Sequence, residues 1–325
     1  MKAITRDAYG SPELLELREL EKPAVGADGV LVRVRASSVN PYDWHLLRGV
    51  PYVVRLMEGL STPKTRVLGA DVSGIVEAVG EEVTEFQPGD EVFGSRDGAF
   101  ADYVRGRERN FAPKPAGLTF EEAAAIPLAG ITALQALRDR GEIQPGQDVL
   151  INGAAGGVGT FSVQIAKAYG AVVTAVCSTR NIELVRSLGA DDVIDYTAED
   201  FTSNGRQHEL IFDIAGNRGL RDIRRALTPD GTLVLVGGGG VSDSLALLGP
   251  MVRSVKAAVT SPFVGQRLLP FLAKIRKEDL LVLKELVEAG KIRPVLDRTY
   301  PLSEVPDAIR YLETGHARGK TVISV

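Results

Sequence analysis

Hydrophobic and polar residues follow two different patterns in this chain, and the pattern changes near residue 117. Before that point apolar and polar residues alternate in runs such as GVLVRVRASSVN, and a Pro-Gly-Asp turn separates the apolar flanks of FQPGDEVFG. Alternation with a period of two residues, broken by such turns, predicts β-strands. The next segment, LTFEEAAAIPLAGITALQAL, carries Thr119 and Glu122 at the spacing of a capping box and predicts a helix. The sequence therefore predicts a strand-rich first domain that ends near residue 117.

The middle of the chain, residues 118–262, alternates helical segments with predicted strands at DVLIN, AVVTAVCS, DVIDY, ELIFDIAG, GTLVLVGGG and VKAAVTS. One helix is predicted from about Val158 to Tyr169, and another ends near Gly189. Gly170 and Gly189 stand where helix C-caps belong. Strands rich in valine and isoleucine that are separated by helices are typical of a parallel sheet with right-handed crossovers. We therefore expect a doubly wound α/β domain over residues 118–262.

Residues 263–325 have a third pattern, without a regular repeat of strand and helix. The segments predict an amphipathic helix at KEDLLVLKELVEAG, a strand at IRPVLDRTYP, a short helix at EVPDAIRYLE and a last strand at KTVISV. Because these pieces do not continue the parallel sheet, we expect them to pack with the first domain. The expected architecture is thus a β-rich domain formed by residues 1–117 and 263–325, joined to a doubly wound domain.

Composition excludes several classes of protein. With 325 residues, 44% hydrophobic and 25% charged, the chain has the mix of a globular protein with about two domains. Its net charge of -4 comes without a basic tract, so it lacks the electrostatic footprint of nucleic-acid binding. No apolar run approaches the roughly 20 residues of a membrane helix, and the N-terminus has no signal-peptide core. The single cysteine fits a reducing compartment, so we expect a cytoplasmic protein. From the charge and the apolar runs we expect neither nucleic-acid nor membrane partners.

The segment NGAAGGVG, residues 152–159, places glycines between the predicted strand DVLIN and the helix that follows. Its last six residues read A-x-G-x-x-G, with Ala154 where the dinucleotide fingerprint has its first glycine. The helix start presents unpaired N–H groups and the positive end of its dipole, so a phosphate group fits against this bare backbone. A tight turn without a ligand is the alternative. The predicted cofactor-binding residues of the turn are Ala155, Gly156, Gly157 and Val158.

The second predicted strand of this domain ends in VCSTRN. NAD-binding proteins have an acidic residue at this position, which bonds the ribose 2′-hydroxyl. This chain instead has the hydroxyls of Ser178 and Thr179 and the positive charge of Arg180, a set that suits a 2′-phosphate and lacks a carboxylate that would repel it. The three residues are therefore predicted to bind NADP(H) in preference to NAD(H). The alternative for Arg180 is a solvated residue at a helix start.

Motifs spread over nearly the whole chain occur in a recognisable order: SSVNPYDWHLLRG, LGADVSGIVEAVG, PGDEVFG, GAFADYV, GAAGGVGTFSVQIAKAYGA, GADDVIDY and ARGKTVISV. Together they resemble the medium-chain dehydrogenase/reductase superfamily, and within it the zinc-independent quinone oxidoreductase branch. The resemblance implies a GroES-like catalytic domain and a Rossmann domain, with the cofactor in the cleft between them. This division agrees with the one predicted from the patterns above.

The resemblance also poses the question of a metal at particular residues. Zinc alcohol dehydrogenases of the superfamily have a cysteine at the position of Asn40, a histidine at that of Ala70 and a third ligand near Leu128. None of these three side chains binds zinc usefully, since zinc takes thiolate, imidazole or carboxylate ligands. A structural zinc lobe with four cysteines is also excluded, because Cys177 is the only cysteine. We therefore expect no metal site.

In the resembling branch, the asparagine and aspartate of an N-P-x-D segment and a tyrosine shortly after it lie beside the nicotinamide and the acceptor. The corresponding residues here, predicted to be catalytic, are Asn40, Asp43 and Tyr52, with Asn40 as an N–H donor to the acceptor oxygen or as a cofactor contact. Tyr42 is the alternative tyrosine, because the loop at residues 51–66 departs from the family pattern. The further cofactor contacts implied by the resemblance are Thr132, Tyr196, Gly237, Gly238 and Lys320.

The predicted function is that of a zinc-independent, NADPH-dependent oxidoreductase. It would transfer reducing equivalents to a quinone or to the activated double bond of an α,β-unsaturated carbonyl, with the protein supplying position and electrostatics. The alternatives are a non-catalytic NADPH-binding, redox-sensing module and an enoyl-thioester reductase. An exposed edge strand at VKAAVTS would invite pairing with a second subunit, so together with the resemblance it predicts a homodimer.

Overall fold

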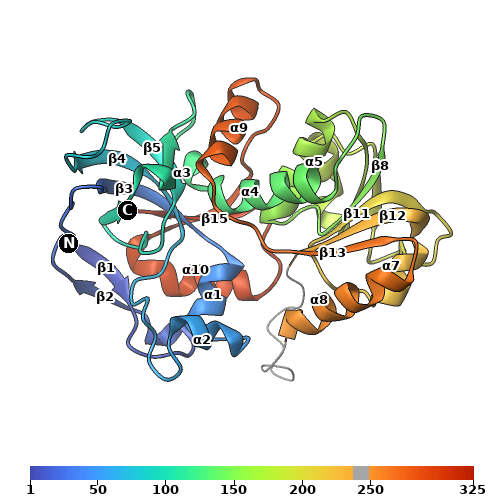
Figure 1. Ribbon diagram of the computed structural model, residues 1–325, viewed down its shortest axis with the longest axis horizontal. Helices are drawn as coiled ribbons and strands as arrows, with labels where there is room; N and C mark the ends of the chain where they lie inside the picture. Colours follow the sequence, from blue (N-terminus) through green and yellow to red (C-terminus); the bar gives the residue numbers. More distant parts are fainter. Residues whose placement is uncertain (237–248) are drawn as a thin grey trace. The chain divides into compact units, whose positions relative to one another are not determined.

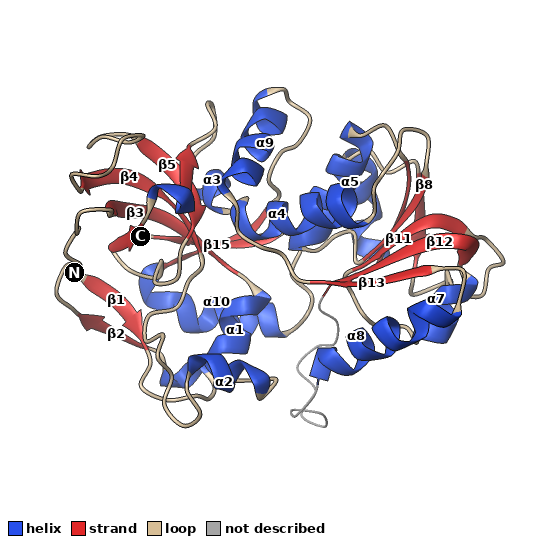
Figure 2. Cartoon of the chain, in the orientation of Figure 1, coloured by secondary structure: helices blue, strands red, loops and turns tan. Residues whose placement is uncertain are grey.

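The computed structural model describes residues 1–236 and 249–325 (Figures 1 and 2). Contacts within the chain divide it into two compact units. The first unit contains Met1–Ile131, Ile275–Ala289 and Pro294–Val325, and the second contains Thr132–Lys274 and Gly290–Arg293. One unit is rich in antiparallel strands and the other holds a parallel sheet, so the predicted α/β fold class is confirmed.

A seven-stranded sheet and a two-stranded ribbon form the framework of the first unit. The ribbon consists of β1 (Lys2–Thr5) and β2 (Glu16–Glu19). The larger sheet has the order β14-β15-β3-β4-β5-β7, with β6 beside β3, and its strands are β3 (Val30–Val39), β4 (Asp71–Val79), β5 (Glu91–Ser95), β6 (Tyr103–Gly106), β7 (Phe111–Pro113), β14 (Leu296–Pro301) and β15 (Lys320–Ser324). The helices are α1 (Pro41–Arg48), α2 (Val53–Glu58), α3 (Phe120–Ala124), α9 (Lys277–Glu288) and α10 (Val305–Glu313), with the short turns η1 (Pro12–Leu14), η2 (Glu108–Asn110) and η7 (Leu302–Glu304).

Strand register brings distant parts of the sequence together at one end of this sheet. β15 runs antiparallel to β3, with Thr321 opposite Val39, and β3 runs antiparallel to β4, with Ser38 opposite Asp71. Helix α1 starts directly after β3 and ends at Gly49, whose φ of 61° is one that glycine adopts readily. The last residues of β3 and the first residues of β4 and β15 therefore lie next to one another.

A parallel sheet of six strands, in the order β10-β9-β8-β11-β12-β13, forms the second unit. Its strands are β8 (Asp148–Asn152), β9 (Val172–Cys177), β10 (Asp192–Asp195), β11 (His208–Asp213), β12 (Leu227–Val236) and β13 (Arg267–Phe271). Its helices are α5 (Gly157–Ala168), α6 (Ile182–Ser187), α7 (Leu220–Arg225) and α8 (Gly249–Thr260), with η3 (Ala136–Arg140), η4 (Thr179–Asn181) and η6 (Ser261–Phe263). Helix α5 covers one face of the sheet, and α7 and α8 cover the other (Figure 1). Helix α4 (Pro127–Gln135) contains the change from the first unit to the second.

The apolar strands of the second unit are buried because helices cover both faces of the sheet. Leu150, Ile211 and Leu233, on three neighbouring strands, are completely buried in one core cluster. The predicted helix from about Val158 to Tyr169 is confirmed as α5. Gly170 and Gly189 have φ values of 82° and 101°, in agreement with the C-cap positions predicted for them.

One predicted strand is wrong. The segment VKAAVTS belongs to the end of α8 and the start of η6, and the sixth strand is β13, which pairs in parallel with β12. Ala257 is completely buried, while Val255 and Val259 are 55% and 62% exposed, and this burial pattern fits a helix. The segment was predicted as a strand because β-branched valines favour strands. The predicted second domain, residues 118–262, ended at this segment and so left β13 out.

The longest described helices, α5, α8 and α9, each have 12 residues. Within residues 1–236 and 249–325, no helix combines the length and apolar character needed to cross a bilayer.

Candidate functional site

The turn between β8 and α5 exposes backbone at the carboxyl end of the parallel sheet. Gly153 has a φ of 93°, and a Cβ at Gly159 would lie 2.1 Å from the Gly153 carbonyl oxygen, so both positions require glycine. A Cβ at Gly156 would meet only this oxygen, at 3.6 Å, and no side chain caps the start of α5. The first-turn N–H groups and the helix dipole thus offer a place for a phosphate group. The predicted contacts in this turn are Ala155, Gly156, Gly157 and Val158.

A carboxylate from a neighbouring strand lies beside the strand end that is predicted to hold a 2′-phosphate. Ser178, Thr179 and Arg180 follow β9, and the last two are exposed. The neighbouring strand β10 ends at Asp195, in register with Cys177. Asp195 Oδ2 accepts a hydrogen bond of 2.5 Å from Thr179 Oγ1, and this bond holds the pKa of the Asp195 carboxyl below its usual range. The segment VCSTRN itself carries no carboxylate, but the carboxylate of Asp195 lies beside it on the neighbouring strand.

The remaining cofactor contacts predicted for the second unit lie in different surroundings. Tyr196 directly follows β10 and is 42% exposed, whereas Thr132 is buried in α4. Gly237 and Gly238 lie outside the described residues. Cys177 is buried, and burial raises the pKa of its thiol to about 11, so the thiol stays protonated near neutral pH.

A buried ion pair lies in the first unit, where β15, β3 and β4 are neighbours. Lys320 begins β15 and Asp71 begins β4, and their side chains are 3% and 0% exposed. Lys320 Nζ lies 3.4 Å from Asp71 Oδ2 and donates to Asn40 Oδ1 at 2.5 Å and to the Val39 carbonyl at 3.3 Å. Burial lowers the pKa of Lys320, while the charge of Asp71 raises it. Each charge of the pair offsets the other in surroundings from which water is excluded.

Hydrogen bonds from three other residues complete the surroundings of Asp71. Its Oδ2 accepts from Ser38 Oγ at 2.6 Å and from Asn40 Nδ2 at 2.9 Å. Its Oδ1 accepts from the Leu128 backbone N–H at 2.8 Å. Both carboxylate oxygens are therefore occupied by donors from this chain.

Asn40 links the two members of the ion pair. Its Nδ2 donates to the Ser38 carbonyl at 3.2 Å and to Asp71, while its Oδ1 accepts from Lys320. A carboxamide has two N–H hydrogens, so both are in use. This arrangement disagrees with the predicted role of Asn40 as an N–H donor to the acceptor oxygen, because such a bond would have to break one of the two that exist.

Asp43 fastens the start of α1 to the segment that precedes β4. Its Oδ2 accepts from the Asn40 backbone N–H at 2.8 Å, and its Oδ1 accepts from the Gly69 backbone N–H at 3.1 Å. Burial raises the pKa of Asp43 to about 7, with a further increase from the charge of Asp71 and opposing effects from the two N–H donors and Lys320. Asp43 therefore orients Asn40 rather than facing solvent.

The two candidate tyrosines differ in their hydroxyl groups. Tyr52 precedes α2, is 43% exposed and has the Arg55 guanidinium 4.8 Å from its ring centroid. Its hydroxyl has no hydrogen-bond partner in the part of the chain that the structure describes. Burial raises the pKa of the Tyr42 hydroxyl, and the charge of nearby Asp97 raises it further. Asn40, Asp43 and Lys320 are thus brought together, while Tyr52 lies on a separate loop.

Asp71, Ser38 and Asp195 belong to these clusters, although the sequence did not predict them as members. The useful signal was strand register, since Ser38 faces Asp71 and Asp195 faces Cys177 across neighbouring strands. A local pattern does not specify which strands are neighbours, so these contacts required the sheet order.

The positions that carry zinc ligands in the resembling alcohol dehydrogenases have other roles here. Asn40 bonds Lys320 and Asp71 through its side chain, and Leu128 bonds Asp71 through its backbone. Ala70 is a buried apolar residue. Over the described ranges, no three His, Cys, Asp or Glu side chains are grouped so that they could hold a metal ion.

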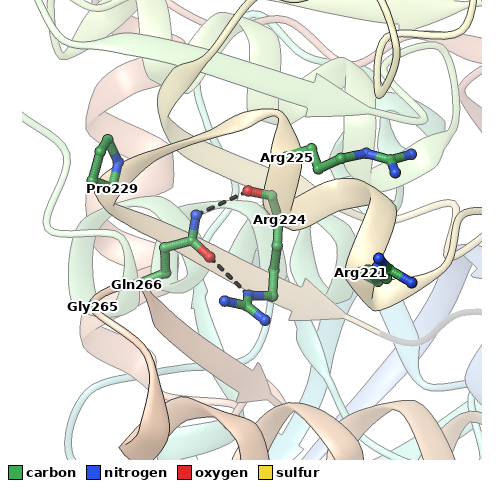
Figure 3. A pocket seen from close by; sticks show the side chains of 6 residues that line it. All are labelled: Arg221, Arg224, Arg225, Pro229, Gly265 and Gln266. Atoms are coloured by element: carbon green, nitrogen blue, oxygen red, sulfur yellow. Dashed lines mark hydrogen bonds between the residues drawn. The ribbon is translucent and has the colours of Figure 1, made fainter.

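A pocket of about 370 Å³ lies at the opposite edge of the parallel sheet, where β12 and β13 begin (Figure 3). Its lining residues are Arg221, Arg224, Arg225, Pro229, Gly265 and Gln266. Gln266 holds Arg224, because its Oε1 accepts from Arg224 Nε at 2.8 Å and its Nε2 donates to the Arg224 carbonyl at 2.9 Å. Open parallel sheets bind ligands at the carboxyl ends of their strands, so this pocket is separate from the candidate cofactor site.

Known proteins resemble this chain along its whole length. Residues 26–116 match the family described as "Alcohol dehydrogenase GroES-like domain", and residues 188–323 match "Zinc-binding dehydrogenase". The Mus musculus protein "NAD(P)H oxidoreductase RTN4IP1, mitochondrial" is 36% identical over 100% of this chain and 89% of its own length. The Arabidopsis thaliana protein "NADPH-dependent alkenal/one oxidoreductase, chloroplastic" is 35% identical over 99% of this chain and 79% of its own.

Solved structures agree with these relatives. The quinone oxidoreductase from Coxiella burnetii has a TM-score of 0.85 and 33% identity to this chain, and the match covers 100% of this chain and 99% of that one. The chain therefore belongs to the medium-chain dehydrogenase/reductase superfamily. Within that superfamily it belongs to the quinone oxidoreductase branch, so the predicted family is confirmed.

Replacing Lys320 with methionine should strongly destabilise the fold, because it leaves the Asp71 carboxylate buried without its counter-charge. We expect the free energy of unfolding to fall by about 3 kcal/mol or more, measured by urea denaturation with circular dichroism. The matched control is Lys284→Met, which breaks a surface pair with Glu288 and should cost about 0.5 kcal/mol or less. The double variant Lys320→Met/Asp71→Asn should recover part of the loss. A Lys320→Met protein as stable as the control would contradict the buried pair.

Proposed function

We propose that this protein is a reductase that uses NADPH and no zinc to deliver reducing equivalents to a quinone or to the activated double bond of an α,β-unsaturated carbonyl. Its relatives support this proposal, since they are named NAD(P)H, alkenal/one and quinone oxidoreductases. The observation that carries it is the polar network at two positions where zinc enzymes of the superfamily have ligands. The Asn40 side chain bonds Lys320 and Asp71, and the Leu128 backbone N–H bonds Asp71.

Zinc does not fit the donor set of this chain. Asn40 offers a carboxamide, and Ala70 and Leu128 offer only apolar side chains, whereas zinc takes thiolate, imidazole or carboxylate. The neighbouring carboxylate of Asp71 already accepts from four donors. Without a Lewis acid, a simple carbonyl is a poor hydride acceptor, while a quinone or an enone is already electron-poor. This difference favours the activated acceptors.

The glycine turn fits the anionic dinucleotide. Gly156 leaves the start of α5 open, and the first-turn N–H groups of that helix would hold the phosphates in place. When bound, the nicotinamide supplies the hydride, and the protein contributes position and electrostatics. In the first unit, Lys320 and Asp43 fix Asn40 and so set where α1 begins.

The acceptor becomes an anion once it has taken up the hydride, and a proton donor completes the reaction. We assign this role to Tyr52, since the residue is 43% exposed and its hydroxyl lacks a partner among the described residues. Burial and the charge of nearby Asp97 raise the pKa of Tyr42, which makes the Tyr42 hydroxyl a weaker proton donor. Asp43 and Asn40 act as positioning residues, because their polar atoms are engaged within the protein.

NADP(H) remains the cofactor we propose. Ser178, Thr179 and Arg180 offer two hydroxyls and a positive charge at the end of β9. Asp195 opposes this preference, since its ionised carboxylate takes the hydrogen bond of Thr179 Oγ1. We therefore propose that the protein prefers NADP(H) to NAD(H), and that the negative charge of Asp195 makes this preference smaller.

A cytoplasmic location and a homodimer also remain proposals. The apolar edge that would pair with a second copy is β13, which lies at the end of the strand order, and not the segment VKAAVTS. Two relatives carry the words mitochondrial and chloroplastic in their names.

Oxidation of NADPH by the purified protein with one quinone, one enone and one simple aldehyde tests the proposed function. We expect turnover with the quinone or the enone and little with the aldehyde. Tyr52→Phe should lower kcat by about a hundredfold and leave the Kd for NADPH unchanged, while the matched Tyr42→Phe should have the smaller effect. NADPH binding without turnover of any acceptor would contradict the proposal and favour a non-catalytic module.

Asp195→Asn should strengthen the preference for NADPH, because it removes a negative charge beside the expected 2′-phosphate. We expect the ratio of the Kd for NADH to that for NADPH to rise about three- to tenfold, measured by titration at low salt. The control is Asp192→Asn at the other end of β10, where Asp192 pairs with Arg206. An unchanged ratio would remove Asp195 from the cofactor site.

A further inference from the structure

Arg253, on α8, reaches the carboxyl ends of two central strands of the second unit. Strands β8 and β11 pair in parallel, and their last residues, Asn152 and Asp213, face each other. Arg253 Nη2 forms an ion pair with Asp213 Oδ2, and the side chains of the two residues are 16% and 0% exposed. Because Gly153 follows Asn152 directly, the guanidinium lies at the same sheet edge as the glycine turn.

Both oxygens of the Asp213 carboxylate already accept hydrogen bonds. Asp213 Oδ1 accepts from Asn152 Nδ2 at 2.7 Å and from the Gly216 N–H at 3.1 Å, and its Oδ2 accepts from Arg253. The second hydrogen of Asn152 Nδ2 goes to Asn217 Oδ1 at 3.0 Å. Asp213 thus uses both carboxylate oxygens and Asn152 both amide hydrogens, whereas Arg253 uses only Nη2.

Two nitrogens of Arg253 are buried without a protein acceptor. Nε and Nη1 have no hydrogen-bond partner among the residues that the structure describes. These atoms carry three of the five N–H hydrogens of a guanidinium. Asp213 compensates the charge but not these donors, and burying unsatisfied donors of a charged group is unfavourable. A ligand that brings anionic oxygens to this edge would satisfy them.

We propose that Arg253 is a cofactor-binding residue, whose Nε and Nη1 donate to the pyrophosphate of NADP(H) while Nη2 stays paired with Asp213. The inference rests on the proposed function, which places the dinucleotide at this sheet edge. Phosphate oxygens match the planar fork of a guanidinium. The 2′-phosphate belongs to a different strand end, at Ser178 and Arg180, so Arg253 contributes equally to the binding of NADPH and NADH.

Titration of both cofactors into the full chain, followed by nicotinamide fluorescence, tests this assignment. Arg253→Met should raise the Kd for NADPH and for NADH by about tenfold or more, and Arg253→Lys should raise both by less. The control is Arg224→Met, which removes the arginine held by Gln266 at the amino ends of the strands (Figure 3) and should leave both values within about twofold.

A second variant separates binding from folding, because Arg253→Met also leaves Asp213 without its counter-charge. Arg253→Met/Asp213→Asn should unfold at nearly the wild-type temperature and still show the tenfold loss for both cofactors. Folded variants that keep both affinities within about twofold would overturn the inference, and a loss confined to NADPH would overturn the pyrophosphate assignment. If the wild type binds neither cofactor, the proposed function fails. If the wild type binds both but the Arg253 variants keep their affinities, only the assignment of Arg253 fails.

Discussion

A buried ammonium ion, Lys320 Nζ, determines how the polar part of the first unit is arranged. It requires a counter-charge, which Asp71 supplies, and an oxygen acceptor, which Asn40 supplies. These partners come from the ends of β15, β4 and β3, so one charge holds three strands together at a single place. Asp43 then ties the start of α1 to the same place. Asn40 and Asp43, two of the three residues predicted to be catalytic, thus belong to this buried network.

The second unit uses charge differently. Its glycine turn presents bare backbone at the carboxyl end of the sheet. Some polar groups nearby are hydrogen-bonded to one another, whereas Arg253 Nε and Nη1 have no acceptor among the described residues. Asp195 and Asp213 each end a strand and each hold a neighbour, Thr179 in one case and Arg253 in the other. Thr179 gives its only hydroxyl hydrogen to Asp195, whereas Arg253 keeps two nitrogens without an acceptor in the described part of the chain, which in our proposal donate to the cofactor.

The predictions from sequence succeeded where the signal was local. The glycine turn, the helix after it and the cap glycines Gly170 and Gly189 depend on residues close together in the chain, and the structure contains all of them. VKAAVTS was misassigned because its valines favour a strand, whereas packing of Ala257 against the sheet decides for a helix. The contacts of Asp71 and Asp195 could not be predicted, because they depend on which strands become neighbours.

The most direct test of the central claim is to measure zinc content and turnover on the same sample. The claim is that Lys320, Asp71 and Asn40 form the polar centre of a reductase that needs no metal. Zinc would be quantified by mass spectrometry in purified protein, and NADPH oxidation with an enone recorded before and after removal of metal by a chelator. The account predicts the same turnover per chain when zinc is far below one equivalent. Turnover that falls with zinc content and returns when zinc is added back would contradict it.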